Sequence, residues 1–323
     1  MEKKIDLHKA RDFSITFSDT FAFIKQNFKS IGKSLVMIVA PVYLIASLAF
    51  SFFSVKLIQA FTGTMKIPNP ERAAQNMLSV YTDFRLWITI LLFFIAVMLA
   101  VGVIFSYINL YRKKGETGSE ITPSEVWSEL WRRLPKFIGY SIGYGFFFII
   151  GYLLLVLFIG LLMTASPLVG GVILFFGILA LMIYLVTFIS VLVPVIFYED
   201  CGFFESLGRT SSLIKGNFWV TFGINFVAYI IVSMSAYIVS LIIYVPIILT
   251  QVGSTTFDTS TIQILVVVYL VVLPVILFFG YIFQYTIGSL NYFSLLEKHD
   301  HVGLRMKVDA IGDADAQKTE EQY

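Results

Sequence analysis

The stretch that decides the fold runs from Ile138 to Tyr198 and reads IGYSIGYGFFFIIGYLLLVLFIGLLMTASPLVGGVILFFGILALMIYLVTFISVLVPVIFY. It contains no Asp, Glu, Lys, Arg or His. A helix needs roughly 20 apolar residues to cross a bilayer, so the stretch can hold two spans joined by a turn near Ala165–Gly171. Lipid offers no partners to backbone polar groups, and the run lacks the alternation of a barrel strand. Both spans are therefore predicted to be helices.

The rest of the chain has the same character. Of its 323 residues, 58% are hydrophobic and 14% are charged, and the mean hydropathy is +0.83. Ordinary soluble domains carry roughly 25% charged residues, so little sequence is left for a separate soluble domain. We expect an all-α integral membrane protein with six spans, at 34–55, 86–110, 138–164, 168–198, 217–249 and 262–296.

Lysine and arginine are distributed unevenly over this topology. Nineteen fall in the N-terminal arm, the loops 111–137 and 199–216, and the C-terminal tail, whereas four fall on the opposite side. Those four are Lys56, Lys66, Arg72 and Arg85. Because Lys and Arg are retained on the cytoplasmic face, we expect both termini to be cytoplasmic.

The expected organisation has three parts. Residues 1–33 form a cytoplasmic arm with an interfacial helix, 34–296 form the membrane domain, and 297–323 form a tail that we expect to be disordered. The arm's helix carries apolar residues at helical spacing, at Phe17, Phe21, Ile24, Phe28 and Ile31. Thr16 with Asp19 predicts its start, and Gly32 predicts a break before the first span.

The same design recurs before the third and fifth spans. A second interfacial helix is expected at 122–135, started by Thr122, Pro123 and Glu125 and ended by Pro135. A third is expected at 200–216, with a break at Gly216. The chain thus reads as three units, each an interfacial helix followed by a helical hairpin.

Lysine and aromatic side chains next to a span sit at the headgroup level, where the lysine stems reach toward water. The three interfacial helices therefore supply the candidate lipid-interface residues. These are Phe21, Ile24, Lys25, Phe28, Lys29, Trp127, Trp131, Lys136, Ile214, Lys215 and Phe218.

A family resemblance rests on residues 198–223, YEDCGFFESLGRTSSLIKGNFWVTFG. This stretch resembles the signature of the membrane domain attached to some glycerophosphodiester phosphodiesterases, and of related stand-alone bacterial membrane proteins. The matching positions are Glu199, Arg209, Ser211, Lys215, Gly216, Asn217 and Phe218. The resemblance implies the six-span body. The hydrolase barrel of the two-domain members is absent from this sequence, so phosphodiesterase activity is not implied.

One segment matches a catalytic pattern, since residues 139–143 read G-Y-S-I-G, as in a nucleophile elbow. All three histidines, His8, His299 and His301, fall in the expected cytoplasmic termini, so Ser141 has no expected base. Small residues on one helical stripe let helices approach closely in lipid, which makes Gly139, Gly143 and Gly151 candidate helix-packing positions. We expect no catalytic residue.

Other ligand sites are not expected either. The run Glu297-Lys298-His299-Asp300-His301 offers metal-ligand chemistry, but a solvated tail is the preferred interpretation. No ionisable residue falls inside an expected span, and such residues usually mark ion or polar-solute pathways. We therefore expect no metal, no cofactor and no coupled transport of polar solutes.

These expectations, together with the resemblance to bacterial membrane proteins, favour a non-enzymatic integral protein of the bacterial inner membrane that engages lipid or supports the assembly of a membrane complex. The alternative is a transporter of a lipid or other hydrophobic molecule, which needs no buried charge. An intramembrane enzyme is the third hypothesis. The expected partners are anionic lipids together with a membrane protein or a second copy of the chain, and not nucleic acid.

Overall fold

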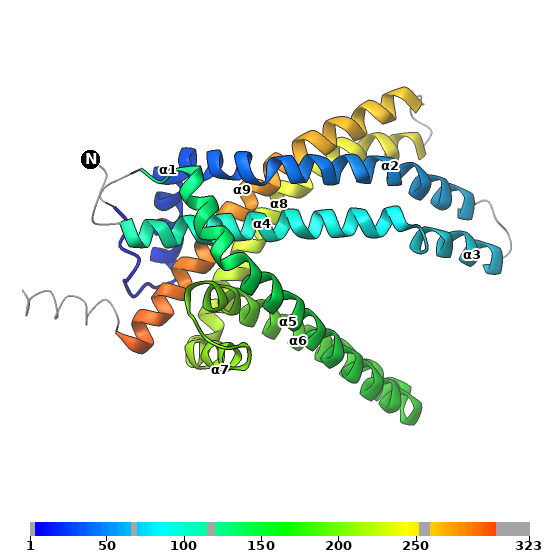
Figure 1. Ribbon diagram of the computed structural model, residues 1–323. Helices are drawn as coiled ribbons and strands as arrows, with labels where there is room; N and C mark the ends of the chain where they lie inside the picture. The colour runs from blue at the N-terminus through cyan, green and yellow to red at the C-terminus, as the bar shows by residue number, and fades with distance from the viewer. Residues whose placement is uncertain (1–3, 66–69, 115–119, 252–258, 302–323) are drawn as a thin grey trace, which may run out of the picture.

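The computed structural model describes residues 4–65, 70–114, 120–251 and 259–301 (Figure 1). Over these residues the chain is helical and has no strand. The helices are α1 (Phe13–Ile38), α2 (Ala40–Met65), α3 (Pro70–Tyr81), α4 (Phe84–Lys114), α5 (Pro123–Ala165), α6 (Pro167–Tyr198), α7 (Phe203–Ile214), α8 (Phe218–Gln251) and α9 (Thr259–Asp300).

Four of the described helical segments are long and apolar enough to cross a bilayer, namely Phe84–Lys114, Pro123–Leu161, Gly170–Tyr198 and Phe218–Ile238. The bent pair of α1 and the first part of α2 makes a fifth if it is counted as one span. The chain therefore has the character of a multi-pass helical membrane protein. The sixth expected span, 262–296, lies in α9, where the side chains of 259–275 and 277–279 are outside the described part.

Figure 1 shows three pairs of helices that share one end of the molecule and diverge toward the other. The pairs are α2 with α4, α5 with α6, and α8 with α9, and within each pair the helices are in contact. At the shared end, α9 contacts α1, α4 and α6, and α7 packs on α6 and α9. Each of these pairs of long helices is thus in contact, and one end of the molecule holds the three pairs together.

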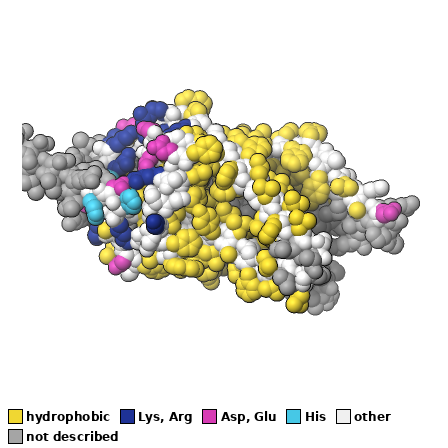
Figure 2. Space-filling model, turned by 90° about the horizontal axis from the view of Figure 1, so that it is seen from below, with side chains coloured by type: hydrophobic (Ala, Val, Ile, Leu, Met, Phe, Trp, Pro, Cys, Tyr) yellow, Lys and Arg dark blue, Asp and Glu magenta, His cyan; other side chains and the backbone are white. Residues whose placement is uncertain are grey.

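Charged side chains gather at that shared end, while apolar side chains cover the flanks of the diverging helices (Figure 2). We call this end the charged base. It comprises residues 4–12, α7, and the adjoining ends of α1, α4, α5, α6 and α9. On the flanks, large hydrophobic side chains such as Leu154, Leu157 and Phe175 are exposed by 58% or more. A folded water-soluble protein rarely exposes a continuous apolar surface of this kind, but a bilayer covers it.

The break expected at Gly32 is wrong. Helix α1 passes through this position without interruption, because Ile31 and Leu35 on either side are buried in the core. The chain bends instead at Val39, by 52°. Pro41 explains the bend, since it lacks a backbone N–H and its ring clashes with the carbonyl four residues earlier.

The break expected at Pro135 is also wrong, and 122–135 is not a separate interfacial helix. It forms the first turns of α5, which continues through Pro135 to Ala165. Leu134 and Phe137 are both buried, so their packing outweighs the single backbone hydrogen bond that the proline removes.

Two helix starts can be compared with expectation. The start of α5 is confirmed, since Oε2 of Glu125 accepts a hydrogen bond from the N–H of Thr122 at 2.9 Å. The start of α1 is not at Thr16, which is buried inside the helix. Its cap is Asp12, whose carboxylate accepts a bond from the N–H of Ile15 at 2.8 Å. The helix thus begins one turn before the expected position.

The end of the molecule opposite the charged base also contains helix. Residues 56–85 connect the first two expected spans, and within them α2 extends to Met65 and α3 occupies Pro70–Tyr81. Asp83 connects the helices here, because Lys56 Nζ lies 2.7 Å and Arg85 Nη2 lies 2.8 Å from its carboxylate. Hydrogen bonds from Arg85 and Lys56 hold the pKa of Asp83 well below its usual range.

Candidate functional site: the charged base

The segment 198–223 contains the end of α6, the short helix α7 and the start of α8. Helix α7 begins after Gly202, whose N–H donates to Oε2 of Glu205 at 3.0 Å. It ends at Ile214, and Gly216 then adopts a φ of +82°, a conformation that glycine takes without strain. The break expected at Gly216 is therefore confirmed. It lets α8 start only two residues later, at Phe218.

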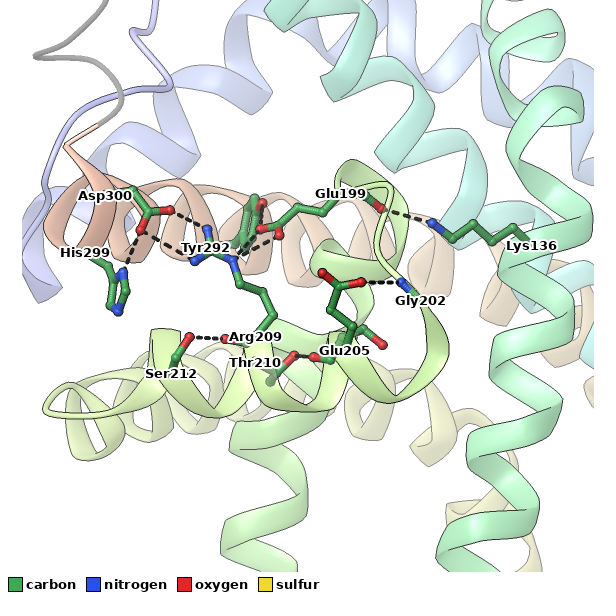
Figure 3. A network of polar contacts seen from close by, with 11 residues as sticks. Lys136, Glu199, Gly202, Glu205, Arg209, Thr210, Ser212, Tyr292, His299 and Asp300 are labelled. Atoms are coloured by element: carbon green, nitrogen blue, oxygen red, sulfur yellow. Dashed lines mark hydrogen bonds and ion pairs between the residues drawn. The ribbon is translucent and has the colours of Figure 1, made fainter.

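Arg209 on α7 joins two carboxylates that come from different parts of the chain (Figure 3). Its Nε lies 3.0 Å from Oε2 of Glu199, and its Nη2 pairs with Asp300 at the end of α9. Glu199 also accepts a hydrogen bond of 2.7 Å from the hydroxyl of Tyr292. The bonds to Asp300 and Glu199 raise the pKa of Arg209, and the bond from Arg209 lowers the pKa of Asp300. Arg209 thus links α7 to the residue after α6 and to the end of α9.

A second polar cluster surrounds Glu129, which is buried on α5. Its carboxylate accepts four bonds, from Asn109 Nδ2 (2.6 Å), Arg132 Nη2 (2.7 Å), Arg133 Nε (2.9 Å) and Lys113 Nζ (3.2 Å). Arg133 in addition donates to the backbone carbonyl of Phe197 at the end of α6. A buried carboxylate is costly unless it is paired and hydrogen-bonded, and this one is. The cluster ties α4, α5 and α6 together.

The residues before α1 form what we call the N-terminal strap, residues 4–12. The backbone N–H of Ile5 donates to the hydroxyl of Tyr111 on α4 at 3.0 Å. The backbone of Arg11 exchanges two hydrogen bonds with Ser294 Oγ on α9, at 2.8 and 3.1 Å. The buried side chain of Arg11 pairs with Asp19 on α1, with Nε 2.8 Å from Oδ2. The strap thus connects α1, α4 and α9.

Most of the expected lipid-interface residues lie on the outer surface of the base. Four of the aromatic residues and three of the lysines are exposed, namely Phe21, Phe28, Trp127, Trp131, Lys25, Lys29 and Lys215. They come from α1, α5 and the loop after α7, so the fold distributes them over three separate elements.

The remaining expected interface residues turn inward. Ile214 is only 6% exposed and belongs to the core, so it is not available to lipid. Ile24 and Phe218 are half-buried and pack against the same core. Lys136 donates to the backbone carbonyl of Glu199 at 3.1 Å and lies over the ring of Tyr140. The helical spacing identified an apolar face, but tertiary packing decided which side chains it buries.

Of the three candidate packing glycines, only Gly143 is in close contact. A Cβ at this position would lie 2.7 Å from the ring of Phe203 on α7, whereas a Cβ at Gly139 or Gly151 would meet nothing within 4 Å. The shared stripe of Gly139, Gly143 and Gly151 is therefore not a single helix contact in the described residues. Close approach occurs elsewhere, for example where Gly280 on α9 faces Val232 on α8.

The G-x-S-x-G segment lies within α5, not at a turn between a strand and a helix. His8 belongs to the strap, and His299 and His301 lie at the end of α9. His299 Nδ1 is 2.6 Å from Asp300. In the described part of the chain, no three His, Cys, Asp or Glu side chains are grouped as metal ligands.

Comparison with known proteins gives no relative. No protein-family model matches this chain, and neither a curated protein nor a solved structure does.

Two residues of the base are not among the candidates expected from the sequence. Glu129 is an acid with basic residues four positions or fewer away on α5, and that spacing is the signal for it. Lys33 lies one helical turn after Lys29 and therefore on the same face of α1.

Proposed function

We propose that this chain is a non-enzymatic integral membrane protein of the bacterial inner membrane that engages anionic lipid through the outer surface of its charged base. In this role it supports a membrane assembly whose cytoplasmic side it contacts. The base faces the cytoplasm in this proposal, because it carries most of the lysine and arginine residues.

One observation carries the proposal. All four tryptophans of the chain are exposed, by 43 to 71%. Trp127, Trp131 and Trp219 lie at or next to the base, and Trp87 lies near the opposite end of α4. Trp is enriched at both interfaces of a membrane because its ring is apolar and its N–H is polar. The exposed tryptophans therefore support a placement with the base at one interface.

Lysines next to the exposed aromatic residues supply the lipid preference. Lys25 and Lys29 are exposed on α1, on either side of Phe28. Each basic group near an anionic leaflet contributes on the order of 1 kcal/mol before screening. The aromatic side chains then set how deeply the base lies in the membrane, and the lysines favour anionic headgroups.

The test compares lipid enrichment around the protein in nanodiscs that contain phosphatidylglycerol and phosphatidylcholine. We expect the wild type to be enriched in phosphatidylglycerol and the double variant Lys25→Glu, Lys29→Glu to lose most of this enrichment. The matched control is Lys9→Glu, Lys298→Glu, which makes the same charge change at exposed positions on the strap and the last turn of α9. Equal enrichment in the wild type and the Lys25→Glu, Lys29→Glu variant would contradict the proposal.

A further inference from the structure

A cavity of about 470 Å³ opens in the base between α1, the end of α4 and the first turn of α5. Its basic lining consists of Lys29 and Lys33 of α1 and Lys4 of the strap, while Glu120 is its one acidic lining residue among those described. The start of α5 lines it as well, and the N-terminus of a helix carries a partial positive charge. The cavity therefore favours an anion.

Lys29 and Lys33 differ from most of the cations around them. Elsewhere in the base, the described ion pairs join Arg11 to Asp19, Lys114 to Glu125, Lys136 to Asp200, Arg209 to Glu199 and Asp300, and three cations to Glu129. Lys29 and Lys33 are exposed and make no ion pair within the described residues. Their charge is thus left for a ligand.

The cavity wall is held in place by hydrogen bonds between its elements. Ser30 Oγ of α1 donates to the carbonyl of Ile121 at 2.8 Å, and the hydroxyl of Tyr107 of α4 donates to Asn27 Oδ1 at 3.0 Å. Tyr111, which is 9% exposed, accepts a bond from Ile5, and among the described residues its own O–H has no acceptor. A buried hydroxyl donor thus lines the cavity together with two unpaired lysines.

An apolar surface continues directly from the two lysines. Val36 and Met37, one helical turn beyond Lys33 on α1, are 60% and 58% exposed. After the bend, Leu44 and Leu48 on α2 are exposed as well. A cationic cavity followed by an exposed apolar helix face matches a molecule with an anionic head and an apolar tail. Free phosphate would contact only the cationic cavity and not the apolar helix face.

We propose that this cavity binds the phosphate group of one anionic phospholipid, whose acyl chains lie along the exposed face of α1 and α2. The inference rests on the proposed function and names a defined site for it. Lys29 and Lys33 contact the phosphate oxygens, and Tyr111 donates a hydrogen bond to one of them. The rest of the outer surface engages lipid only through general attraction.

The test is native mass spectrometry of the full chain in detergent, titrated with phosphatidylglycerol. We expect one lipid to bind more tightly than the others, and the variant Lys29→Gln, Lys33→Gln to bind that lipid on the order of thirty-fold more weakly, as expected for two basic groups at an anionic headgroup. The variant Lys29→Arg, Lys33→Arg keeps both charges and should retain the tightly bound lipid. The matched control Lys25→Gln, Lys215→Gln removes two exposed lysines outside the cavity and should retain it too.

Two further measurements distinguish the ways in which the proposal could fail. Inorganic phosphate at millimolar concentration should not displace the tight lipid, and displacement would show that the site takes phosphate alone. If Lys29→Gln, Lys33→Gln and the control lose the tight lipid equally, or neither loses it, the cavity is not the site. Nanodisc enrichment of phosphatidylglycerol in the wild type would then still support the proposed function, whereas its absence would overturn both.

Discussion

In the charged base, hydrogen bonds and ion pairs join segments that are far apart in the sequence. Along the diverging ends of the three helix pairs, which we call the arms, each helix contacts mainly its hairpin partner. Arg11 and Ser294 bond to each other across 283 residues, and Arg209 and Asp300 across 91. Along α5 and α6, by contrast, only 11% of the most apolar window is buried in each helix.

This difference indicates which interactions stabilise each region. Polar networks and close packing within the protein fix the base, since its buried charges must be paired there. The arms bury little surface against the rest of the protein, so the bilayer has to cover them. Substitutions should therefore cost stability in the base and be tolerated in the arms.

Gly143 and Gly151 provide the largest expected contrast, because they lie on the same helix, one in the base and one in the arm. Gly143→Leu should destabilise the protein by about 3 kcal/mol, since the new side chain must displace Phe203, whose ring stacks on Tyr144 at 4.2 Å. A Cβ at Gly151 has no atom within 4 Å, so Gly151→Leu should change stability little. Unfolding in detergent measures both, and equal losses would refute the contrast.

Substitution of Arg209 should cause the next largest loss of stability. Arg209→Gln leaves Glu199 and Asp300 without their cation and should cost about 2 kcal/mol, less than a fully buried pair because the site is partly open to water. Lys215→Gln, six residues later and exposed, is the matched control and should be neutral. A neutral Arg209→Gln would mean that the network does not hold α7 to α9.

His8 in the strap should give a smaller, pH-dependent effect. Burial lowers its pKa from the ordinary value of 6.5, with Arg112 and Arg11 acting in the same direction and Asp6 and Glu297 opposing them. A histidine whose pKa is lowered by folding takes up its proton more readily in the free strap. Docking of the strap is therefore strongest above pH 6.5 and weakens as the pH falls below it.

Hydrogen exchange measures this effect at the amide of Arg11, which donates to Ser294. After correction for intrinsic rates, protection should fall between pH 7.5 and 5. His8→Phe should remove that pH dependence, while His301→Phe, exposed at the end of α9, should keep it. Protection that is unchanged in the wild type at pH 5 would show that His8 does not control docking.

Local patterns explain what the sequence could predict. The uncharged run Ile138–Tyr198 requires a membrane helical hairpin whatever surrounds it, and Gly216 and the start of α5 depend only on nearby backbone atoms. The breaks expected at Gly32 and Pro135 failed because burial of the neighbouring residues favoured a continuous helix. A break signal states a local preference, and core packing can exceed it.

The candidate site depended more on long-range contacts. Exposure of Phe28 and Trp131 followed from the amphipathic pattern, but burial of Ile214 depends on α7 lying against α6 and α9. The basic cavity joins α1 to the start of α5, which lies about ninety residues further along the chain. No local signal could predict that juxtaposition.

The central claim is that the base lies at a membrane interface and gathers anionic lipid there. The most direct measurement is fluorescence quenching by brominated lipid in variants that keep a single tryptophan, either Trp131 in the base or Trp87 near the opposite end of α4. Vesicles contain equal phosphatidylglycerol and phosphatidylcholine, with only one of the two brominated. We predict that brominated phosphatidylglycerol quenches Trp131 more strongly than brominated phosphatidylcholine does, and that Trp87 shows no such preference. Equal quenching of Trp131 by the two lipids, or no quenching by either, would contradict the account.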